Sequence, residues 1–221
     1  MHLRELIYLT RRNIMIIQQQ TVCDVIATNA YFYVDEKTKH GFLIDPGAEA
    51  DLLLKEIDDK GYIIEKILLT HGHFDHIGAV EKIAQTLNIP YFIHHEGKKY
   101  LTDATYNLSA WFVKPIILEK AQYFDDGDVI CLSSAPDICL RVIYTPGHTS
   151  DSVIFYDKVN KIAFCGDTVF REGVGRTDVP GGDMQSLWQS IENRIWSLPD
   201  DTILYCGHGL QTSVENEKYR R

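Results

Sequence analysis

Thr70–His76, with the sequence THGHFDH, places three imidazoles and one carboxylate within six consecutive positions, 71 to 76. The segment follows directly on a short apolar run, Lys66–Leu69, which is typical of a buried strand. Neutral imidazole and carboxylate groups are the ligands that zinc and similar divalent metals take in proteins. Solvated loop histidines are the alternative interpretation, but so many metal-binding groups at one strand end serve no obvious folding need. The spacing therefore predicts a metal site where a buried strand ends.

Three further apolar runs predict strands that end close to a glycine and one possible metal ligand. A glycine beside a ligand lets the backbone approach a small, crowded site. The runs, each with the ligand that follows it, are Leu140–Tyr144 with His148, Ile162–Gly166 with Asp167, and Ile203–Cys206 with His208. Together with the first motif they give the candidate set His71, His73, Asp75, His76, His148, Asp167 and His208.

Seven candidate ligands are more than one tetrahedral zinc ion needs. They suit two divalent ions about 3.5–4 Å apart that share one carboxylate and a bridging water, whose pKa then falls to near 7. Other histidines carry a weaker signal. We expect His94 and His95, at the end of another strand candidate, to be structural rather than to reach the mouth of the site.

The chain has 221 residues, of which 45% are hydrophobic, enough for one sizeable core or at most two small ones. Its formal net charge of −9 argues against nonspecific binding to nucleic acid or to anionic membranes. The longest apolar runs are only a few residues, far short of a transmembrane helix. We therefore expect a small-molecule partner, with no nucleic acid and no membrane.

The five cysteines include no CxxC pair, and no export signal precedes them. We therefore expect reduced thiols in a cytoplasmic protein, most of them in the core. Cys165 and Cys206, each two residues before a candidate ligand, are expected beside the ligands or in the core, not as ligands themselves.

Met15 begins a fresh apolar run, Met15–Ile17, and is a possible alternative first residue. We interpret residues 1–14 as an N-terminal extension and residues 15–221 as one domain. The alternative is that the first residues form an ordinary helical turn packed on this domain.

Strand candidates come first in hairpins and then alternate with amphipathic helices, and the pattern recurs in the second half of the chain. Apolar stripes with helical spacing cover Ala50–Ile57, Ile77–Leu87 and Met184–Ile195. This arrangement predicts two sheets flanked by helices and built from two similar halves. The remaining strand candidates are Tyr31–Asp35, Gly41–Asp45, Lys66–Thr70, Tyr91–His94 and Ser152–Tyr156.

Gly97–Asp125 is the least regular segment of the chain. Its aromatic side chains either line the mouth of a substrate site or pack the segment against the body of the domain. They are Tyr100, Tyr106, Trp111 and Phe112.

The motifs THGHFDH, TPGH, GDT and GHG, in this order and at these intervals, resemble the metallo-β-lactamase superfamily over nearly all of Met15–Arg221. The resemblance implies an α/β fold, a four-layer αββα sandwich, with a dinuclear metal site at the rim where the sheets meet. It implies that His71, His73 and His148 hold the first metal. Asp75, His76 and His208 would then hold the second metal, and Asp167 would bridge the two.

Gly166–Asp183, with the sequence GDTVFREGVGRTDVPGGD, is similar to short glyoxalase II-like hydrolases and to persulfide dioxygenases. The aspartate at 167 also separates this chain from classical zinc β-lactamases, which tend to have cysteine there. The glyoxalase II resemblance implies a metal-dependent hydrolase that cleaves a thioester, such as S-lactoylglutathione or a related low-molecular-weight thiol ester. A metal-bridging hydroxide would attack the carbonyl, and Asp75 would orient the water or take its proton. The two divalent ions would be zinc, with iron or manganese as alternatives.

This chain departs from the glyoxalase II pattern in two ways. Only Gly209–Arg221 follow the last candidate ligand, so the helical domain of the long enzymes is not expected. Those enzymes have a lysine and a tyrosine in the loop where this chain has Arg176-Thr177-Asp178. Either Arg176 replaces the lysine as partner of a substrate carboxylate, or Arg176 and Asp178 brace the loop between themselves. Asp151 stands where relatives usually have glycine.

Three other functions compete with thioester hydrolysis. The first is a mononuclear iron persulfide dioxygenase, because the same ligands persist in that branch. The second is a nuclease or phosphoesterase, which the net charge of −9 disfavours. The third is a nonenzymatic metal-binding protein, and the presence of the full ligand set argues against it.

Overall fold

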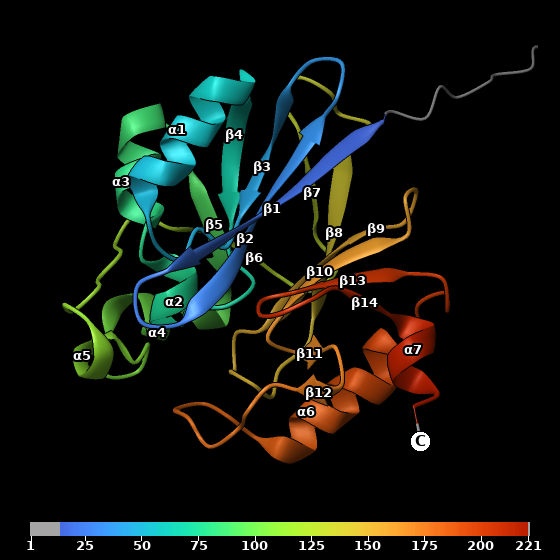
Figure 1. The fold of residues 1–221 in the computed structure, drawn as a ribbon. Helices are drawn as coiled ribbons and strands as arrows, with labels where there is room; N and C mark the ends of the chain where they lie inside the picture. The colour runs from blue at the N-terminus through green and yellow to red at the C-terminus, as the bar shows by residue number, and fades with distance from the viewer. Residues whose placement is uncertain (1–13, 221) are drawn as a thin grey trace, which may run out of the picture.

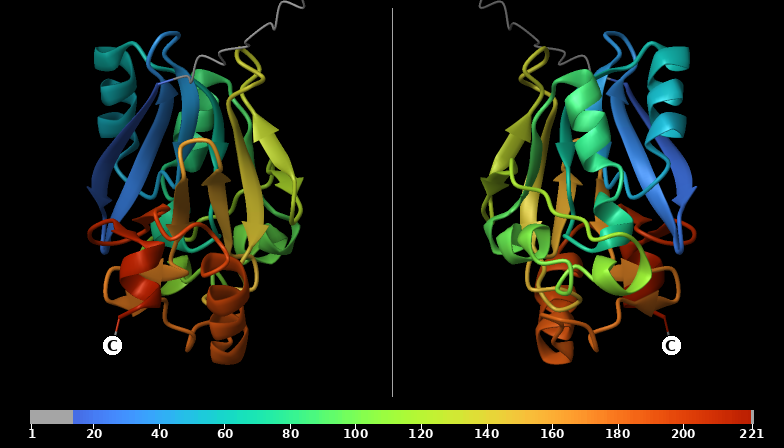
Figure 2. Two further views of the ribbon diagram at one scale, coloured as in Figure 1. Left: turned by 90° about the vertical axis from the view of Figure 1, so that its right-hand side faces the viewer. Right: turned by 90° about the vertical axis from the view of Figure 1, so that its left-hand side faces the viewer.

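The computed structural model describes residues 14–220. Two six-stranded sheets pack against each other, and helices cover their outer faces (Figure 1). The predicted αββα sandwich is thereby confirmed. The turned views in Figure 2 show α6, α7 and the last described residues together at the lower end of the molecule.

The first sheet follows the chain order β1-β2-β3-β4-β5-β6. Its first three strands are antiparallel hairpins, and the pairs from β3 to β6 are parallel. Its strands are β1 Met15–Cys23, β2 Ala27–Asp35, β3 His40–Ile44, β4 Ile63–Leu68, β5 Tyr91–His94 and β6 Gln122–Phe124.

The second sheet has the order β14-β13-β10-β9-β8-β7, and only its β10–β13 pair is parallel. Its strands are β7 Val129–Cys131, β8 Cys139–Tyr144, β9 Val153–Asp157, β10 Ile162–Gly166, β13 Ile203–Cys206 and β14 Thr212–Ser213. A separate ribbon pairs β11 Val169–Phe170 with β12 Gly173–Val174.

The longer helices follow the predicted apolar stripes, and short helical turns fill the connections. They are α1 Ala50–Lys60, α2 Phe74–Ile77, α3 Val80–Leu87, the 3-10 turn η1 His95–Gly97, α4 Lys98–Thr102, α5 Ser109–Phe112, α6 Met184–Ser190, the π-helical turn η2 Ile191–Ile195 and α7 Val214–Lys218.

Three apolar layers correspond to the three contacts in the sandwich. Leu53 of α1 and Ile83 of α3 pack on the outer face of the first sheet. Aromatic side chains such as Tyr33 and Phe164 fill the space between the sheets, where their rings are 5.5 Å apart. Leu187 of α6 belongs to the third layer, on the outer face of the second sheet.

The predicted helix Ile77–Leu87 is divided in the structure into α2 and α3. The β3–α1 loop causes the division, because the Ala79 amide donates to the Pro46 carbonyl at 2.9 Å. A Cβ at Gly78 would lie 2.3 Å from the Gly47 carbonyl oxygen, so only glycine fits there. The break places Asp75 and His76 on the short α2 rather than at the start of a long helix.

The expectation that all five cysteines are reduced is wrong for Cys131 and Cys139, which form a disulfide. These residues lie directly opposite each other in the antiparallel β7–β8 pair, a register that sequence spacing did not reveal because β7 was not predicted. Cys23, Cys165 and Cys206 are free. Cys165 and Cys206 belong to the buried core, as expected.

The proposed N-terminal extension lies outside the described residues except for Ile14, whose carbonyl accepts from the Glu36 amide at 2.9 Å. The start of the domain at Met15 stays a prediction, although β1 begins at this residue. Within residues 14–220, no helix is long and apolar enough to cross a membrane.

Candidate metal centre

The seven candidate ligands come from loops and a helical turn that follow four strands, β4, β8, β10 and β13. Ring nitrogens of His71, His73 and His148 form one group whose atoms lie within 4.8 Å of one another. Donor atoms of Asp75, His76 and His208 form a second such group. The structure thus brings together both half-sites that the sequence implied, although the role of each residue as a ligand stays a prediction.

Asp167 lies between the two half-sites. Its Oδ2 is 3.5 Å from His148 Nε2 in the first group and 3.2 Å from His208 Nε2 in the second. Its Oδ1 is 3.4 Å from His76 Nε2. One carboxylate therefore faces histidines of both groups, which is the placement that a bridging ligand requires.

Several donor atoms of the centre are buried and have no hydrogen-bond partner among the described residues. They include Nε2 of His71, Nε2 of His76 and Oδ1 of Asp167. Such orphaned polar atoms are costly unless another group satisfies them. Imidazole and carboxylate are together the donor set of zinc, iron and manganese, so these residues fit a divalent metal pair.

Burial favours the neutral, metal-binding form of two histidines in the first half-site. Burial, with the neighbouring His76, lowers the pKa of His71 well below its usual value, and burial lowers that of His73 to about 3. Both rings are therefore neutral at pH 7, the form that binds metal. Burial opposes ionisation of Asp75, but His76 and His208 outweigh it and hold the pKa of this carboxyl at about 2.

The outward-facing ring nitrogens of three histidines are held by hydrogen bonds. His148 Nδ1 donates to the Arg176 carbonyl at 2.7 Å, and His208 Nδ1 donates to the Ala27 carbonyl at 2.7 Å. His76 Nδ1 lies 3.0 Å from Asp45 Oδ2. Because a carbonyl can only accept, Nδ1 of His148 and Nδ1 of His208 each carry a proton, which leaves Nε2 as the ring atom that would bind metal. Burial opposes protonation of His208 Nε2, but Asp167 and Asp75 raise the pKa of this ring to about 10, so a metal ion would have to displace its second proton.

Asp45, which the sequence analysis placed only at the end of the strand candidate Gly41–Asp45, holds two residues of the THGHFDH loop. Its Oδ1 accepts from the Thr70 amide at 2.8 Å, and its Oδ2 accepts from Thr70 Oγ1 at 2.6 Å. The same carboxylate holds His76, so it joins the end of β3 to the THGHFDH loop. A buried aspartate at the end of an apolar strand was the signal that could have identified it.

Glycines beside the ligands permit the close approach that the sequence predicted. A Cβ at Gly207 would lie 2.2 Å from Asp167 Oδ1. Gly147, in the TPGH motif, has φ +142°, and a Cβ there would lie 2.2 Å from the backbone of Leu187 in α6. Neither position accommodates a side chain.

Asp151 is fully buried behind the first ligand loop, and neither carboxylate oxygen has a hydrogen-bond partner among the described residues. A Cβ at Gly72 would lie 3.3 Å from its Oδ2, and one at Gly97 would lie 3.0 Å away. Burial raises the pKa of Asp151 from 3.8 to about 7. The unusual aspartate is therefore a buried carboxyl group beside the loop that carries His71 and His73.

The remaining candidates are placed as follows. Arg176 and Asp178 form a two-pronged ion pair, with Nε–Oδ1 at 2.7 Å and a second contact at 2.8 Å, and both side chains are exposed. His94 is buried and stacks on Tyr144 with ring centroids 4.3 Å apart. His95 lies on the surface beside Asp125. Together, the donor atoms of His94, His95 and Asp125 form a further group outside the seven-residue set.

Comparison with known proteins agrees with this geometry. The sequence model of the metallo-beta-lactamase superfamily matches residues 23–208. The chain belongs to this superfamily. Membership, together with the histidine and aspartate clusters, supports a metal-dependent hydrolase.

Two curated relatives cover most of the chain. The probable metallo-hydrolase YqgX of Bacillus subtilis is 36% identical over 194 residues, 87% of this chain and 90% of that protein. The hydroxyacylglutathione hydrolase GloC of Haemophilus influenzae is 33% identical over 183 residues, 81% of this chain and 85% of that protein.

Two solved structures share the fold. The BLEG-1 B3 metallo-beta-lactamase superposes with a TM-score of 0.86 at 33% identity, covering 93% of this chain and 97% of the other. TTHA1623, in a di-iron-bound form, superposes with a TM-score of 0.80 at 32% identity, covering 91% of this chain and 97% of the other.

Replacing the carboxylate that holds His76 is expected to weaken metal binding. Asp45→Asn keeps the size of the side chain but removes the charge that orients His76 and Thr70. The affinity for zinc should fall about 10- to 100-fold, measured by competition with a chromogenic chelator. Asp35→Asn is the matched control, because Asp35 is equally buried but bonds only to Thr38 in a distant turn. Equal affinities in the two variants would contradict the assigned role.

Asp151→Asn is expected to change how stability depends on pH. The folded carboxyl keeps its proton up to about pH 7, whereas the unfolded one loses it near 3.8, so wild-type stability falls as the pH rises between these values. In the metal-free proteins, the free energy of unfolding of the variant minus that of wild type should therefore grow as the pH rises over this interval. The difference should grow by roughly 1.4 kcal/mol per pH unit at most. Urea denaturation at several pH values measures the difference. Asp51→Asn, on an exposed carboxylate, should follow wild type, and a pH-independent difference for Asp151→Asn would refute the prediction.

Proposed function

We propose that this protein hydrolyses a thioester, such as S-lactoylglutathione or a related low-molecular-weight thiol ester. The observation that carries the proposal is the pair of three-residue donor groups that share the carboxylate of Asp167. When bound, a pair of divalent ions there supplies a water of lowered pKa and positive charge for a developing oxyanion.

The residues of the chain would position the nucleophile. Asp75 is buried, and its Oδ2 accepts from Thr28 Oγ1 at 3.0 Å and lies 3.4 Å from His208 Nε2. Because its pKa is held at about 2, the carboxylate is ionised at neutral pH. It can therefore accept a hydrogen bond from the attacking water and orient it towards the carbonyl carbon.

The relatives support the reaction class and the metal pair. GloC is named as a hydroxyacylglutathione hydrolase, which acts on a glutathione thioester, and TTHA1623 holds two irons. We propose zinc as the resident metal, with iron or manganese as alternatives, since imidazole and carboxylate ligands suit all three. BLEG-1 is named as a B3 metallo-beta-lactamase, so β-lactam hydrolysis is the second activity to assay.

The central test pairs elemental analysis of the purified protein with hydrolysis of S-lactoylglutathione. We expect two metal ions per chain and hydrolysis that a chelator abolishes. His208→Ala should lose one ion and at least 100-fold in kcat/KM, because it removes a ligand of one half-site. His40→Gln, a histidine that bonds to Glu65 away from the centre, is the control and should retain both.

The competing functions give different outcomes. One iron per chain with oxygen uptake on a persulfide would replace the hydrolase by a dioxygenase. Two bound ions with cleavage of a chromogenic β-lactam alone would keep the hydrolase class and remove the thioester. Cleavage of a phosphodiester alone would favour a nuclease or phosphoesterase.

Arg176 is the proposed anchor for a substrate carboxylate, and its ion pair with Asp178 makes the role testable. Asp178→Ala should lower KM for S-lactoylglutathione several-fold, because it releases the exposed guanidinium. Arg176→Ala should raise KM and leave the metal content unchanged, since the carbonyl that holds His148 is retained. If both variants keep the wild-type KM, the two residues only brace the loop.

A further inference from the structure

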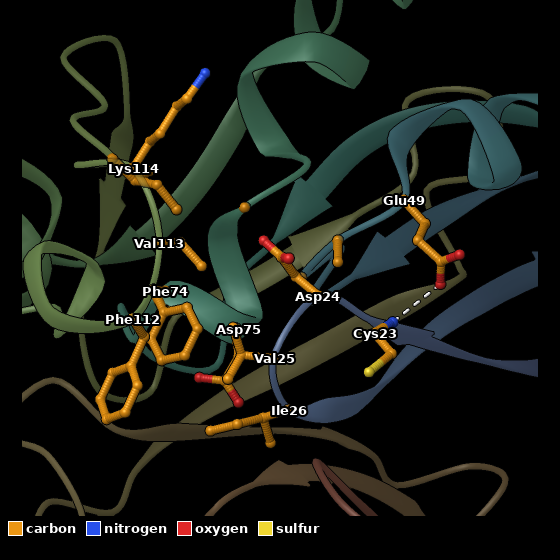
Figure 3. A pocket seen from close by; sticks show the side chains of 14 residues that line it. Cys23, Asp24, Val25, Ile26, Glu49, Phe74, Asp75, Phe112, Val113 and Lys114 are labelled. Atoms are coloured by element: carbon orange, nitrogen blue, oxygen red, sulfur yellow. Dashed lines mark hydrogen bonds between the residues drawn. The ribbon is translucent and has the colours of Figure 1, made fainter.

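A cavity of about 630 Å³ opens directly beside Asp75 (Figure 3). Four segments enclose it: the β1–β2 turn, the β3–α1 loop, α2 and the chain that follows α5. Asp75 is the only candidate ligand among the lining residues. The cavity therefore adjoins the half-site of Asp75, His76 and His208.

Aromatic and aliphatic side chains form the walls nearest to this carboxylate. Phe74 and Phe112 stack with ring centroids 5.4 Å apart and an angle of 14° between the planes. Phe112 is 50% exposed, and Ile26 and Val25 of the β1–β2 turn are 41% and 50% exposed. Figure 3 shows the two phenyl rings together on one side of Asp75, with Ile26 close by. Apolar surface at loop tips around a reactive carboxylate is available to an apolar ligand.

The charges of the lining residues disfavour an anionic group in the cavity. Three carboxylates line it, those of Asp24, Glu49 and Asp75, against one cation, Lys114. Lys114 extends away from Asp75 in Figure 3. Glu49 is already bound to the backbone amide of Cys23 at 2.9 Å. Apart from a metal ion in the adjoining half-site, a free carboxylate of a substrate would meet no cationic side chain of the cavity lining near Asp75.

We propose that this cavity binds an apolar substituent of the substrate thioester, packed between the Phe74–Phe112 pair and the β1–β2 turn. The inference rests on the proposed thioester hydrolysis and defines its specificity. The apolar substituent belongs either to the acyl group or to the thiol. On the other flank of the centre, the loop of Arg176 contacts His148 and is the side that suits an anionic group.

Two series of thioesters test this proposal. In the first series the thiol is N-acetylcysteamine and the acyl chain grows from acetyl to hexanoyl. In the second series the acyl group is acetyl and the thiol carries a growing alkyl chain. We expect kcat/KM to rise in one series by roughly three- to four-fold for each buried methylene, and the responding series identifies which side of the thioester is bound.

The variant Phe112→Ala should flatten this chain-length dependence, and Ile26→Ser should weaken it, because each removes apolar wall. Trp111→Ala is the matched control, since Trp111 is the neighbouring aromatic residue, 60% exposed, and does not line the cavity. It should keep the wild-type dependence. The proposal would be overturned if kcat/KM did not depend on chain length in either series. It would also be overturned if the Trp111 and Phe112 variants lost the chain-length dependence to the same extent.

A binding measurement separates this proposal from the proposed function. S-hexyl-N-acetylcysteamine is a thioether that cannot be hydrolysed, and calorimetry measures its affinity for the metal-loaded protein. If no thioester is cleaved but the thioether binds, and binds about tenfold more weakly to Phe112→Ala than to Trp111→Ala, the apolar site stands without the hydrolase activity. Absence of binding to the wild-type protein would remove the site whatever the activity.

Discussion

The carboxylate of Asp45 is the contact on which the metal centre depends. It accepts hydrogen bonds from the amide and the hydroxyl of Thr70 and contacts the ring of His76. One side chain thus joins the end of β3, the loop after β4 and the turn α2. All three donors are buried, where an unpaired carboxylate would be costly. Movement of the THGHFDH loop as a unit would leave the buried carboxylate of Asp45 without its hydrogen-bond donors. The loop is therefore held in place, and the two half-sites keep their spacing.

Around this anchor the centre concentrates groups that oppose one another in the absence of metal. Ring nitrogens of the three histidines of one half-site lie within 4.8 Å of one another, and His73 Nδ1 is only 3.0 Å from His148 Nε2. Two carboxylates, Asp75 and Asp167, lie among histidines of the other half-site. A rigid sandwich of two sheets holds these groups together, since each ligand follows a strand whose apolar residues are packed in the core. The stability of the packed core thus holds the histidine and aspartate side chains of the centre together.

Much of this arrangement could be predicted from the sequence, because apolar strands that end in glycine and a ligand leave a strong pattern. Ile162–Gly166 and Ile203–Cys206 coincide with strands β10 and β13. Strands of two or three residues, such as β7, carry too little periodicity to detect. The division of α2 from α3 depends on a carbonyl from Pro46, and the cavity depends on a turn far from α5 in sequence. Contacts of this kind are tertiary, so no local pattern contains them.

Two of the candidate ligand histidines, His148 and His208, are held by backbone carbonyls rather than by side chains. A carbonyl is present whatever residue occupies the position, so sequence drift at positions 27 and 176 leaves these two hydrogen bonds in place. The same two segments, the β1–β2 turn and the Arg176 loop, also carry the side chains that we propose to face substrate. The protein can therefore exchange specificity while its metal centre stays intact, which makes these loops the natural targets for laboratory evolution of new substrates.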